Sequence, residues 1–385
     1  MLKRTFAVLF TLALALTLGV VVPGASQAAS TDPLTLLAKK SAGTCGQYAT
    51  NEYLCGKHVA TSSATSSTSA AVSAQVPVSA SIVTGSSCGA SSKWGQQRFQ
   101  GCQNGYVTQW QHWQYNTNGT VTLLGTINTE SRQLYSTKKG STNITHKYEI
   151  WRSSAGTGTY NQTSLRVETT DKICTVTNGS VGYLTWNGYI TGNHTVSCNV
   201  AAGKKVTAAL ALSYVVLPGS SAGDKVIPEK LSHPAIRCDR VTYVGSRAGC
   251  VLTAVQPTFK MSTKDAATKH TAAHVKAAQK SLKDHWGNHA LGGKVLTRKY
   301  WGAGKSTNNP NRKVACKGFV KKNSTDSCDE YPFASTHQGA YYVGKSRVSV
   351  AHVPSADNSK AGSKLATFFS TYRILDTDAF WVSVS

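Results

Sequence analysis

Carboxylate side chains are scarce in this 385-residue sequence, which has 17 Asp and Glu against 41 Lys and Arg and a formal net charge of +24. From Cys238 onward, 22 basic residues face only 9 acidic ones, so the excess of positive charge is densest in the C-terminal part. Such a surface attracts polyanions such as nucleic acid, anionic wall polymers or acidic membranes. A solvated exported protein would show the same balance, so charge alone does not choose the partner.

After residue 22 the sequence has no apolar run of the roughly 20 residues that a membrane span requires. The N-terminus itself combines a basic start (Met1–Arg4), an apolar run (Phe6–Val22) and small residues up to Ala28–Ala29. This order is typical of a secretory signal, with cleavage expected after Ala28. We therefore expect an extracellular protein, exported through a Sec-type signal peptide, with no membrane anchor.

The sequence also lacks any Cys-x-x-Cys pair, which disfavours a metal clip. An even number of cysteines in an exported chain favours disulfides, because the compartment is oxidising. The simplest connectivity joins each cysteine to the next one along the chain, although the sequence does not establish it. The five expected pairs are Cys45 with Cys55, Cys88 with Cys102, Cys174 with Cys198, Cys238 with Cys250, and Cys316 with Cys328.

The chain divides into parts that differ in residue composition. We expect a signal peptide at 1–28, an N-terminal segment with a Ser/Thr/Ala-rich linker at 29–87, a β-rich domain at 88–218, a linker at 219–235 and a C-terminal domain at 236–385. Residues 88–218 contain short alternating runs rich in Thr, Tyr, Val and Trp, separated by Asn/Gly turns such as 116–119. They predict an antiparallel all-β sandwich or barrel.

The C-terminal part mixes helical and strand patterns, which predicts an α+β domain. Ala-rich residues from Asp265 to Trp286 predict a helix, and a second helix is expected from Ser355 or Asp357 to Phe369. The expected strands are Tyr341–Val343, Val348–Val353 and Phe380–Val384. The chain is thus multidomain, with an all-β part followed by an α+β part.

Two of the scarce carboxylates are adjacent in the run Ser327–Ser335, where Asp329 and Glu330 follow Cys328 and precede Tyr331-Pro332. Paired carboxylates suit a hard cation such as Mg²⁺ or Mn²⁺, or general-base work on a water. The alternative is a turn closed by Pro332. From these residues alone both interpretations stand.

Further motifs follow the acidic pair in a specific order: Gln338-Gly339-Ala340, then Val353-Pro354-Ser355-Ala356-Asp357-Asn358, then Ala361-Gly362-Ser363. Together with Asp329-Glu330-Tyr331-Pro332, they resemble the NucA/NucB family of secreted bacterial deoxyribonucleases. The resemblance runs from about Ile236 to the C-terminus and does not cover residues 30–230. It implies a metal-dependent endonuclease domain, related in its core to the ββα-metal nucleases.

The resemblance also implies roles for individual residues. Asp329 is expected to activate the attacking water, with Glu330 orienting or assisting, and Glu330 and Asn358 are expected to hold a divalent cation, Mg²⁺ or Mn²⁺. Two positions depart from the family pattern. Gln338 replaces a Glu and cannot ionise, and His352 stands where no histidine is required; each is kept as a candidate catalytic residue, with a structural role for His352 as the alternative.

Histidines four residues apart, His270 with His274 and His285 with His289, share a helix face if the helix forms. The sequence lacks a Glu between either pair, which disfavours the His-Glu-x-x-His protease arrangement. Structural or solvent roles are favoured for all four, and an approach of His274 to the active site stays open as the alternative. Basic residues flank the motifs and are expected to contact DNA phosphates without reading sequence. They are Lys313, Lys317, Lys321, Lys322, Lys345, Arg347, Lys360 and Lys364.

These observations lead to one expected function and to alternatives. The expected function is a secreted metal-dependent endonuclease that hydrolyses extracellular DNA with little sequence specificity. The main alternative is a non-catalytic binder of extracellular DNA or wall polymer with a degenerate nuclease fold, and the Gln at position 338 supports it. A secreted antibacterial nuclease toxin is a third. A wall polymer or another ligand remains an open partner for the β-rich domain.

Overall fold

The computed structural model describes residues 32–59, 88–90, 93–152, 157, 164–171, 173–177, 182–184, 189–217, 226–230, 233–303 and 309–385. The expected signal peptide, most of the Ser/Thr/Ala-rich linker and most of the 219–235 linker lie outside the described residues. Among the described helices, none has the length and hydropathy that crossing a bilayer requires.

A nine-stranded sheet dominates the first part of the chain, and its main path runs β1-β2-β5-β6-β7-β11-β9. Short strands β3 and β4 both pair with β5, and every pairing in this sheet is antiparallel except β3 with β5. The strands are β1 (Thr44–Ala49), β2 (Glu52–Val59), β3 (Gly89–Ala90), β4 (Gly95–Gln97), β5 (Gln100–Tyr115), β6 (Val121–Ser136), β7 (Asn143–Arg152), β9 (Thr175–Thr177) and β11 (Tyr189–Ser197).

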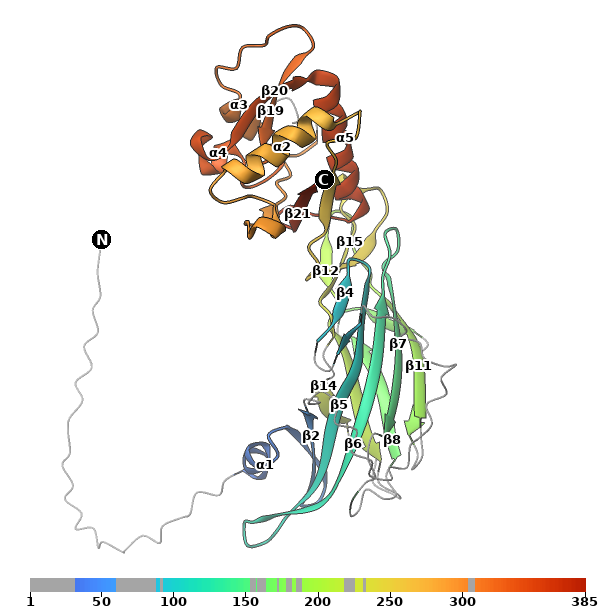
Figure 1. Cartoon of the computed structure of the whole chain (residues 1–385). Coiled ribbons are helices and arrows are strands. Elements are labelled where there is room, and N and C mark those ends of the chain that lie inside the picture. The colour runs from blue at the N-terminus through green and yellow to red at the C-terminus, as the bar shows by residue number, and fades with distance from the viewer. Residues whose placement is uncertain are drawn as a thin grey trace, which may run out of the picture.

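A second sheet of four strands lies against the first and runs β10-β8-β13-β14. Its strands are β8 (Ser164–Asp171), β10 (Gly182–Leu184), β13 (Leu210–Leu217) and β14 (Val226–Lys230). Strand β14 lies beside β1 and β2, and β10 lies beside β11, so the two sheets meet along both sides. Helix α1 (Pro33–Ser41) packs beside β1 and β2 (Figure 1). The described part of this region is thus a barrel-like antiparallel arrangement, and it takes its first two strands from the segment before residue 88.

The hairpin of β5 and β6 shows how local sequence sets the register. The turn predicted at 116–119 forms: the Asn116 N–H donates to the Thr120 carbonyl, and Gly119 has a φ of 77°, which only glycine adopts without strain. Before the turn, Trp110 and Trp113 pair with Ile127 and Leu123 across the strands. The expectation of strands in this stretch is confirmed.

The C-terminal part packs helices against small sheets around a separate apolar core (Figure 1). Its helices are α2 (Lys269–Ser281), α3 (Pro310–Ala315), α4 (Ala340–Val343) and α5 (Ser355–Thr371), with short 3-10 turns η3 (Thr242–Val244), η4 (His289–Leu291) and η5 (Lys345–Arg347). Its strands are β17 (Thr258–Met261), β18 (Leu296–Thr297), β19 (Asp326–Tyr331), β20 (Ser349–Pro354) and β21 (Ala379–Val384). Strand β21 pairs with β17 and β18, and β19 pairs with β20.

Strands β19 and β20 form an antiparallel pair, and α5 follows directly and packs on both. Helix α2 covers the same hairpin. Val275 from α2, Leu365 and Phe369 from α5, and Tyr331 from β19 are all buried in the shared core. The order strand, strand, helix agrees with the expected ββα arrangement.

Two sequence expectations fail in detail. The strand expected at Tyr341–Val343 is the short helix α4, because Asn311 accepts the Tyr341 N–H and packs against Gly339, where a Cβ would lie 2.2 Å from the Asn311 side chain. The helix expected from Asp265 to Trp286 is shorter, since the chain becomes extended at Leu282. Both differences come from tertiary contacts that local propensity does not contain.

The junction between the two parts is a three-stranded sheet in the order β12-β15-β16, made of β12 (Lys205–Thr207), β15 (Ile236–Asp239) and β16 (Gly249–Leu252). Ile236 and Leu252 are fully buried in a core that also holds Tyr135 and Val196 of the large sheet. Residues 236–252 therefore pack with the β-rich part, while the domain boundary at 236 stays a prediction.

A buried cluster of charges also joins the two parts. Arg98 and Arg237 both bind the Asp378 carboxylate, at 3.1 and 2.7 Å, and Arg373 is paired with Asp239. Arg98 also donates to the Tyr372 carbonyl, and burial lowers the pKa of Arg98 to about 10 despite Asp378. Because each charge has a close partner of opposite sign, the cluster fixes how the parts meet.

All five expected disulfides are present with the sequential connectivity. Cys238–Cys250 ties β15 to β16, and Cys316–Cys328 ties the end of α3 to β19. The second of these fixes the residue just before Asp329, as the sequence predicts.

Candidate active site

The hairpin β19–β20 sorts the candidate residues onto two faces. Successive side chains of a strand point to opposite sides, so Asp329 and Glu330 point apart although they are neighbours. In the register of the pair, Cys328 lies opposite His352 and Asp329 lies opposite Ala351. Among the described strands β19 has β20 as its one partner, which leaves its other edge toward a pocket.

Asp329 faces helix α2, where it meets a histidine. Its Oδ2 lies 2.6 Å from His274 Nδ1, and His274 Nε2 lies 2.9 Å from Ser349 Oγ on β20. Asp329 and His274 are only 5 % and 9 % exposed. A short hydrogen bond away from water holds the Asp329 carboxylate in one orientation.

Helix α2 is brought to this place by Asp357, the residue before Asn358. The Asp357 carboxylate accepts the N–H groups of His270 and Thr271 and the Thr271 hydroxyl, at 2.9, 3.1 and 2.6 Å. It thereby caps the first turn of α2 from α5, a task that Thr268 at the N-cap does not perform. Burial raises the pKa of Asp357, and these hydrogen bonds outweigh burial and leave the pKa below its usual value.

Glu330 faces helix α3 on the other side of the strand. Its Oε1 accepts from Arg312 Nε at 3.0 Å, and Oε2 lies 3.8 Å from the Cys316 sulfur of the adjacent disulfide. Burial raises the pKa of Glu330 to about 7; Arg312 opposes this rise and the charge of Asp329 adds to it. A carboxyl with this pKa can exchange a proton near neutral pH.

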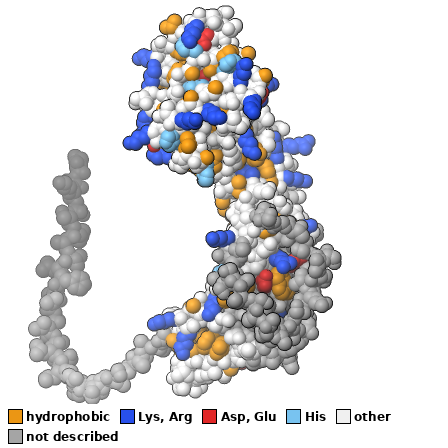
Figure 2. All heavy atoms as spheres, in the orientation of Figure 1, with side chains coloured by type: hydrophobic (Ala, Val, Ile, Leu, Met, Phe, Trp, Pro, Cys, Tyr) orange, Lys and Arg blue, Asp and Glu red, His pale blue; other side chains and the backbone are white. Residues whose placement is uncertain are grey.

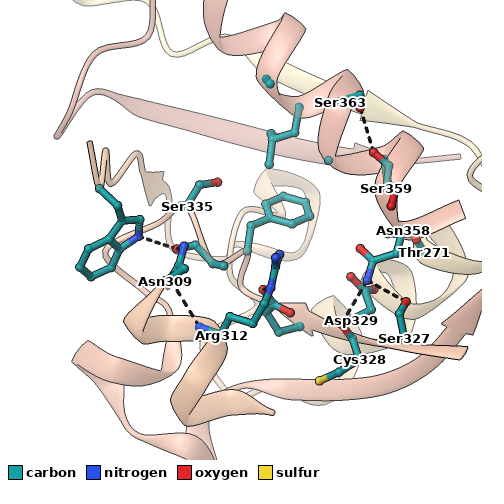
Figure 3. A pocket seen from close by; sticks show the side chains of 18 of the residues that line it. Thr271, Asn309, Arg312, Ser327, Cys328, Asp329, Ser335, Asn358, Ser359 and Ser363 are labelled. Carbon is teal, nitrogen blue, oxygen red and sulfur yellow. Dashed lines mark hydrogen bonds and ion pairs between the residues drawn. The ribbon is translucent and has the colours of Figure 1, made fainter. Parts of the chain in front are cut away.

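Asn358, on the first turn of α5, is oriented by its amide nitrogen. Its Nδ2 donates to Ser327 Oγ at 3.2 Å and to the Cys328 carbonyl at 3.1 Å. Both donor bonds go to β19, so the amide oxygen is the end left for a ligand. Figure 3 shows Asn358 beside Asp329, Ser327 and Cys328 on one side of the pocket, with Asn309 and Arg312 on the other.

The pocket has a volume of about 1010 Å³ and collects side chains from β19, α3, α5 and the segment 298–302. Its polar lining includes Arg312, Lys321, Ser327, Asp329, Glu330 and Asn358. Its apolar and aromatic lining includes Tyr243, Tyr300, Trp301, Phe333, Leu365 and Phe369. Both carboxylates of the adjacent pair therefore reach the same cavity from opposite faces of one strand.

The oxygen atoms at this edge suit a hard divalent cation. Asp329 has a second carboxylate oxygen besides the one bound to His274, and Asn358 offers its amide oxygen. Mg²⁺ is commonly held by one or two carboxylates together with waters and substrate phosphates. Another group of close potential ligands, Cys316, Cys328 and Glu330, is unsuitable because the two sulfurs are bonded to each other.

Comparison with known proteins gives a match to the part of the chain that forms most of this pocket. Residues 292–383 match the family model of deoxyribonuclease NucA/NucB. The match covers β18, α3, β19, β20, α5 and most of β21, and so Asp329, Glu330 and Asn358. Curated proteins and solved structures give no match to the chain. We call residues 292–383 the NucA/NucB segment.

Two of the residues predicted from the NucA/NucB resemblance lie away from this pocket. Gln338 holds β18: its Oε1 accepts the Thr297 N–H at 2.9 Å and its Nε2 donates to Thr297 Oγ1. His352 lies on the face opposite Asp329, where its Nδ1 is 2.6 Å from Asp326 and its ring packs on Phe319. Neither side chain lines the pocket.

Some of the basic residues predicted to contact phosphate are paired with other groups of the protein, and others are exposed. Lys321 lines the pocket, whereas Arg347 pairs with Asp284 and Lys364 pairs with Asp265. Lys345 donates to the Lys317 carbonyl at 2.6 Å. The remaining predicted residues, Lys313, Lys317, Lys322 and Lys360, have exposed side chains. Figure 2 shows Lys and Arg spread over the visible face of the C-terminal part, with few acidic side chains between them.

Sequence reasoning missed the partners of both carboxylates. The sequence allows His274 to approach the active site but favours a structural or solvent role for it, and it lies before the NucA/NucB segment, so the family motifs give no signal for it. Arg312 was left out of the basic set. The only sequence signal for His274 is its helical spacing to His270. Its contact with Asp329, 55 residues away, is seen only in the structure.

Proposed function

We propose that the C-terminal part of this protein is a secreted, metal-dependent deoxyribonuclease that hydrolyses phosphodiester bonds of extracellular DNA with little sequence specificity. The observation that carries the proposal is that Asp329, bound by His274, and Asn358 both line one pocket and both lie in the segment that matches the NucA/NucB family model. The five disulfides are in keeping with an exported chain.

In the proposed mechanism Asp329 accepts a proton from the attacking water. His274 donates a hydrogen bond to Asp329 and keeps its second oxygen toward the pocket. The water oxygen bonds to phosphorus as the bond from phosphorus to the leaving sugar oxygen breaks. Glu330, with a pKa of about 7, supplies a proton to that leaving oxygen.

Arg312 and Lys321 line the same pocket and are suited to hold the phosphate. Asn358 would hold the Mg²⁺ or Mn²⁺ ion with its amide oxygen, and the ion would neutralise the charge that develops on phosphate. Contacts to phosphate carry no sequence information, so the proposed specificity is for the backbone.

The alternative of a non-catalytic binder loses its main support. It rested on Gln338 in place of a Glu, but Gln338 is bonded to Thr297 outside the pocket. A Gln there leaves the proposed catalytic groups in place.

A matched pair of variants tests the proposal. Asp329 and Asp326 are both buried on β19 and each lies 2.6 Å from a histidine Nδ1, but only Asp329 lines the pocket. With supercoiled plasmid and Mg²⁺ or Mn²⁺, we expect nicking by the purified full chain, its loss in EDTA, and a loss of at least about 100-fold in Asp329→Asn. Asp326→Asn should nick within about twofold of the unchanged protein. Equal nicking by Asp329→Asn would refute the assignment.

A further inference from the structure

Exposed aromatic rings gather beside the pocket. Tyr341 and Tyr342 are 59 % and 44 % exposed, and among the described residues they are the one pair of large exposed apolar side chains adjacent in sequence. The Tyr342 ring stacks on Trp301 at 5.8 Å and 22°, and Tyr341 meets both rings edge-on at 6.3 and 5.2 Å. We call Trp301, Tyr341 and Tyr342 the aromatic platform.

The platform is held rigidly by one carbonyl group. Trp301 Nε1 donates to the Ala334 carbonyl at 3.0 Å, and this oxygen also accepts from the side chains of Asn309 and Asn311. The Asn311 amide oxygen accepts the Tyr341 N–H at 3.0 Å, which fixes the start of α4. The indole N–H of Trp301 therefore already has an acceptor, and a ligand would contact the apolar faces of the rings.

The platform continues the proposed active site. Trp301 lines the same pocket as Asp329, Asn358 and Arg312. Lys299 Nζ lies 5.3 Å from the centre of the Trp301 ring, and Lys299 also lines the pocket. Rings flanked by a cation, next to a cavity with its own cations, suit a ligand that has flat apolar faces along an anionic backbone.

We propose that the aromatic platform binds unpaired bases of a DNA strand whose phosphates enter the pocket, so that the protein prefers single-stranded or locally opened DNA. This inference rests on the proposed function and adds the form of the substrate. Every base has a π-face that can stack on Trp or Tyr, but in a duplex neighbouring bases cover those faces. A platform of this kind therefore discriminates by strand pairing and not by sequence.

Binding measured in EDTA separates stacking from cleavage. We would measure fluorescence anisotropy of a labelled 12-nucleotide dT strand and of an abasic strand of equal length and charge with the full chain. The dT strand should bind several-fold more tightly. Tyr341→Ala should weaken dT binding about tenfold, since a stacked base contributes at least about 1 kcal/mol, and should leave abasic binding unchanged.

Two controls make the experiment decisive. Tyr341→Phe keeps the ring and should bind the dT strand like the unchanged protein, and Leu291→Ala removes a different apolar side chain, 46 % exposed, and should have no effect. Equal affinity for dT and abasic strands, an equal loss for both in Tyr341→Ala, or binding of a wall glycan in place of the dT strand would each overturn the inference.

The plasmid assay keeps the two proposals apart. Nicking that depends on Asp329, without base-dependent binding, would refute the platform and leave the nuclease. Base-dependent binding that Tyr341→Ala removes, without any nicking, would support the platform and refute the nuclease.

Discussion

His146 in the β-rich part and His274 in the C-terminal part are both buried, but their surroundings differ. The His146 ring stacks on Tyr135 at 4.1 Å, and within the described part of the chain neither of its ring nitrogens has a hydrogen-bond partner. His274 has a carboxylate on one nitrogen and a hydroxyl on the other. Burial alone therefore does not distinguish the two histidines; what distinguishes them is that His274 binds a carboxylate that lines the pocket.

The same contrast holds for the carboxylates of the C-terminal part. Asp357 is buried and its carboxylate accepts hydrogen bonds from the first turn of α2, whereas Glu330 is buried beside Arg312 at the pocket with a raised pKa. The first stabilises the fold that positions His274, and the second is available for proton transfer. Three predictions test whether the buried groups assigned to proton transfer and those assigned to the fold differ in this way.

The largest effect is expected for Glu330→Gln. If Glu330 donates a proton to the leaving oxygen, the variant should lose about 100-fold in the rate of DNA cleavage at pH 7. In the unchanged protein the rate should fall as pH rises above about 7, because the carboxyl with that pKa loses its proton. A pH–rate profile should show this decline, and the variant should lack it; a decline that persists in Glu330→Gln would assign it to another group.

A smaller effect is expected for His274→Gln. Gln lacks the imidazole ring that joins Asp329 to Ser349, so Asp329 should be held less firmly and the cleavage rate should fall about tenfold. His352→Gln is the matched control, since His352 makes the same 2.6 Å contact with an aspartate on β19, but that aspartate, Asp326, does not line the pocket. Equal losses in both variants would contradict the assignment of His274 as a positioning residue.

The smallest effect concerns stability. Burial, followed by the nearby His194 and His233, lowers the pKa of His146 well below its ordinary value. The unfolded chain therefore binds more protons as the pH falls through about 6.5, and the free energy of unfolding should fall by about 1 kcal/mol between pH 7.5 and 5.5 through this group. Urea unfolding at the two pH values should show this loss, and His146→Phe, which keeps an aromatic ring on Tyr135, should reduce it. An unchanged pH dependence of stability in His146→Phe would show that His146 is not its cause.

Local sequence predicts the parts of this fold that depend on local chemistry. The strand pattern, the turn before Gly119, the sequential disulfides and the helices α2 and α5 all follow from residues near one another. The helix α4 does not, because Asn311 and Gly339 decide it from outside Tyr341–Val343.

The candidate site divides in the same way. The motif order located Asp329, Glu330 and Asn358, and the structure places all three at one pocket. Their partners, His274 and Arg312, come from separate helices and contact the strand only after folding. The alternation of side chains along β19, which separates two neighbouring carboxylates, required the strand and its register to be known.

The charge cluster between the two parts limits how the protein can be divided. A C-terminal fragment that begins at the NucA/NucB segment would keep Asp378 but lose both arginines that bind it, Arg98 and Arg237, and the aspartate that pairs with Arg373. It would also lose α2 and His274. The NucA/NucB segment is thus not a transferable module. Gene fusion or recombination at its first residue would transfer the motif without the residues that orient it.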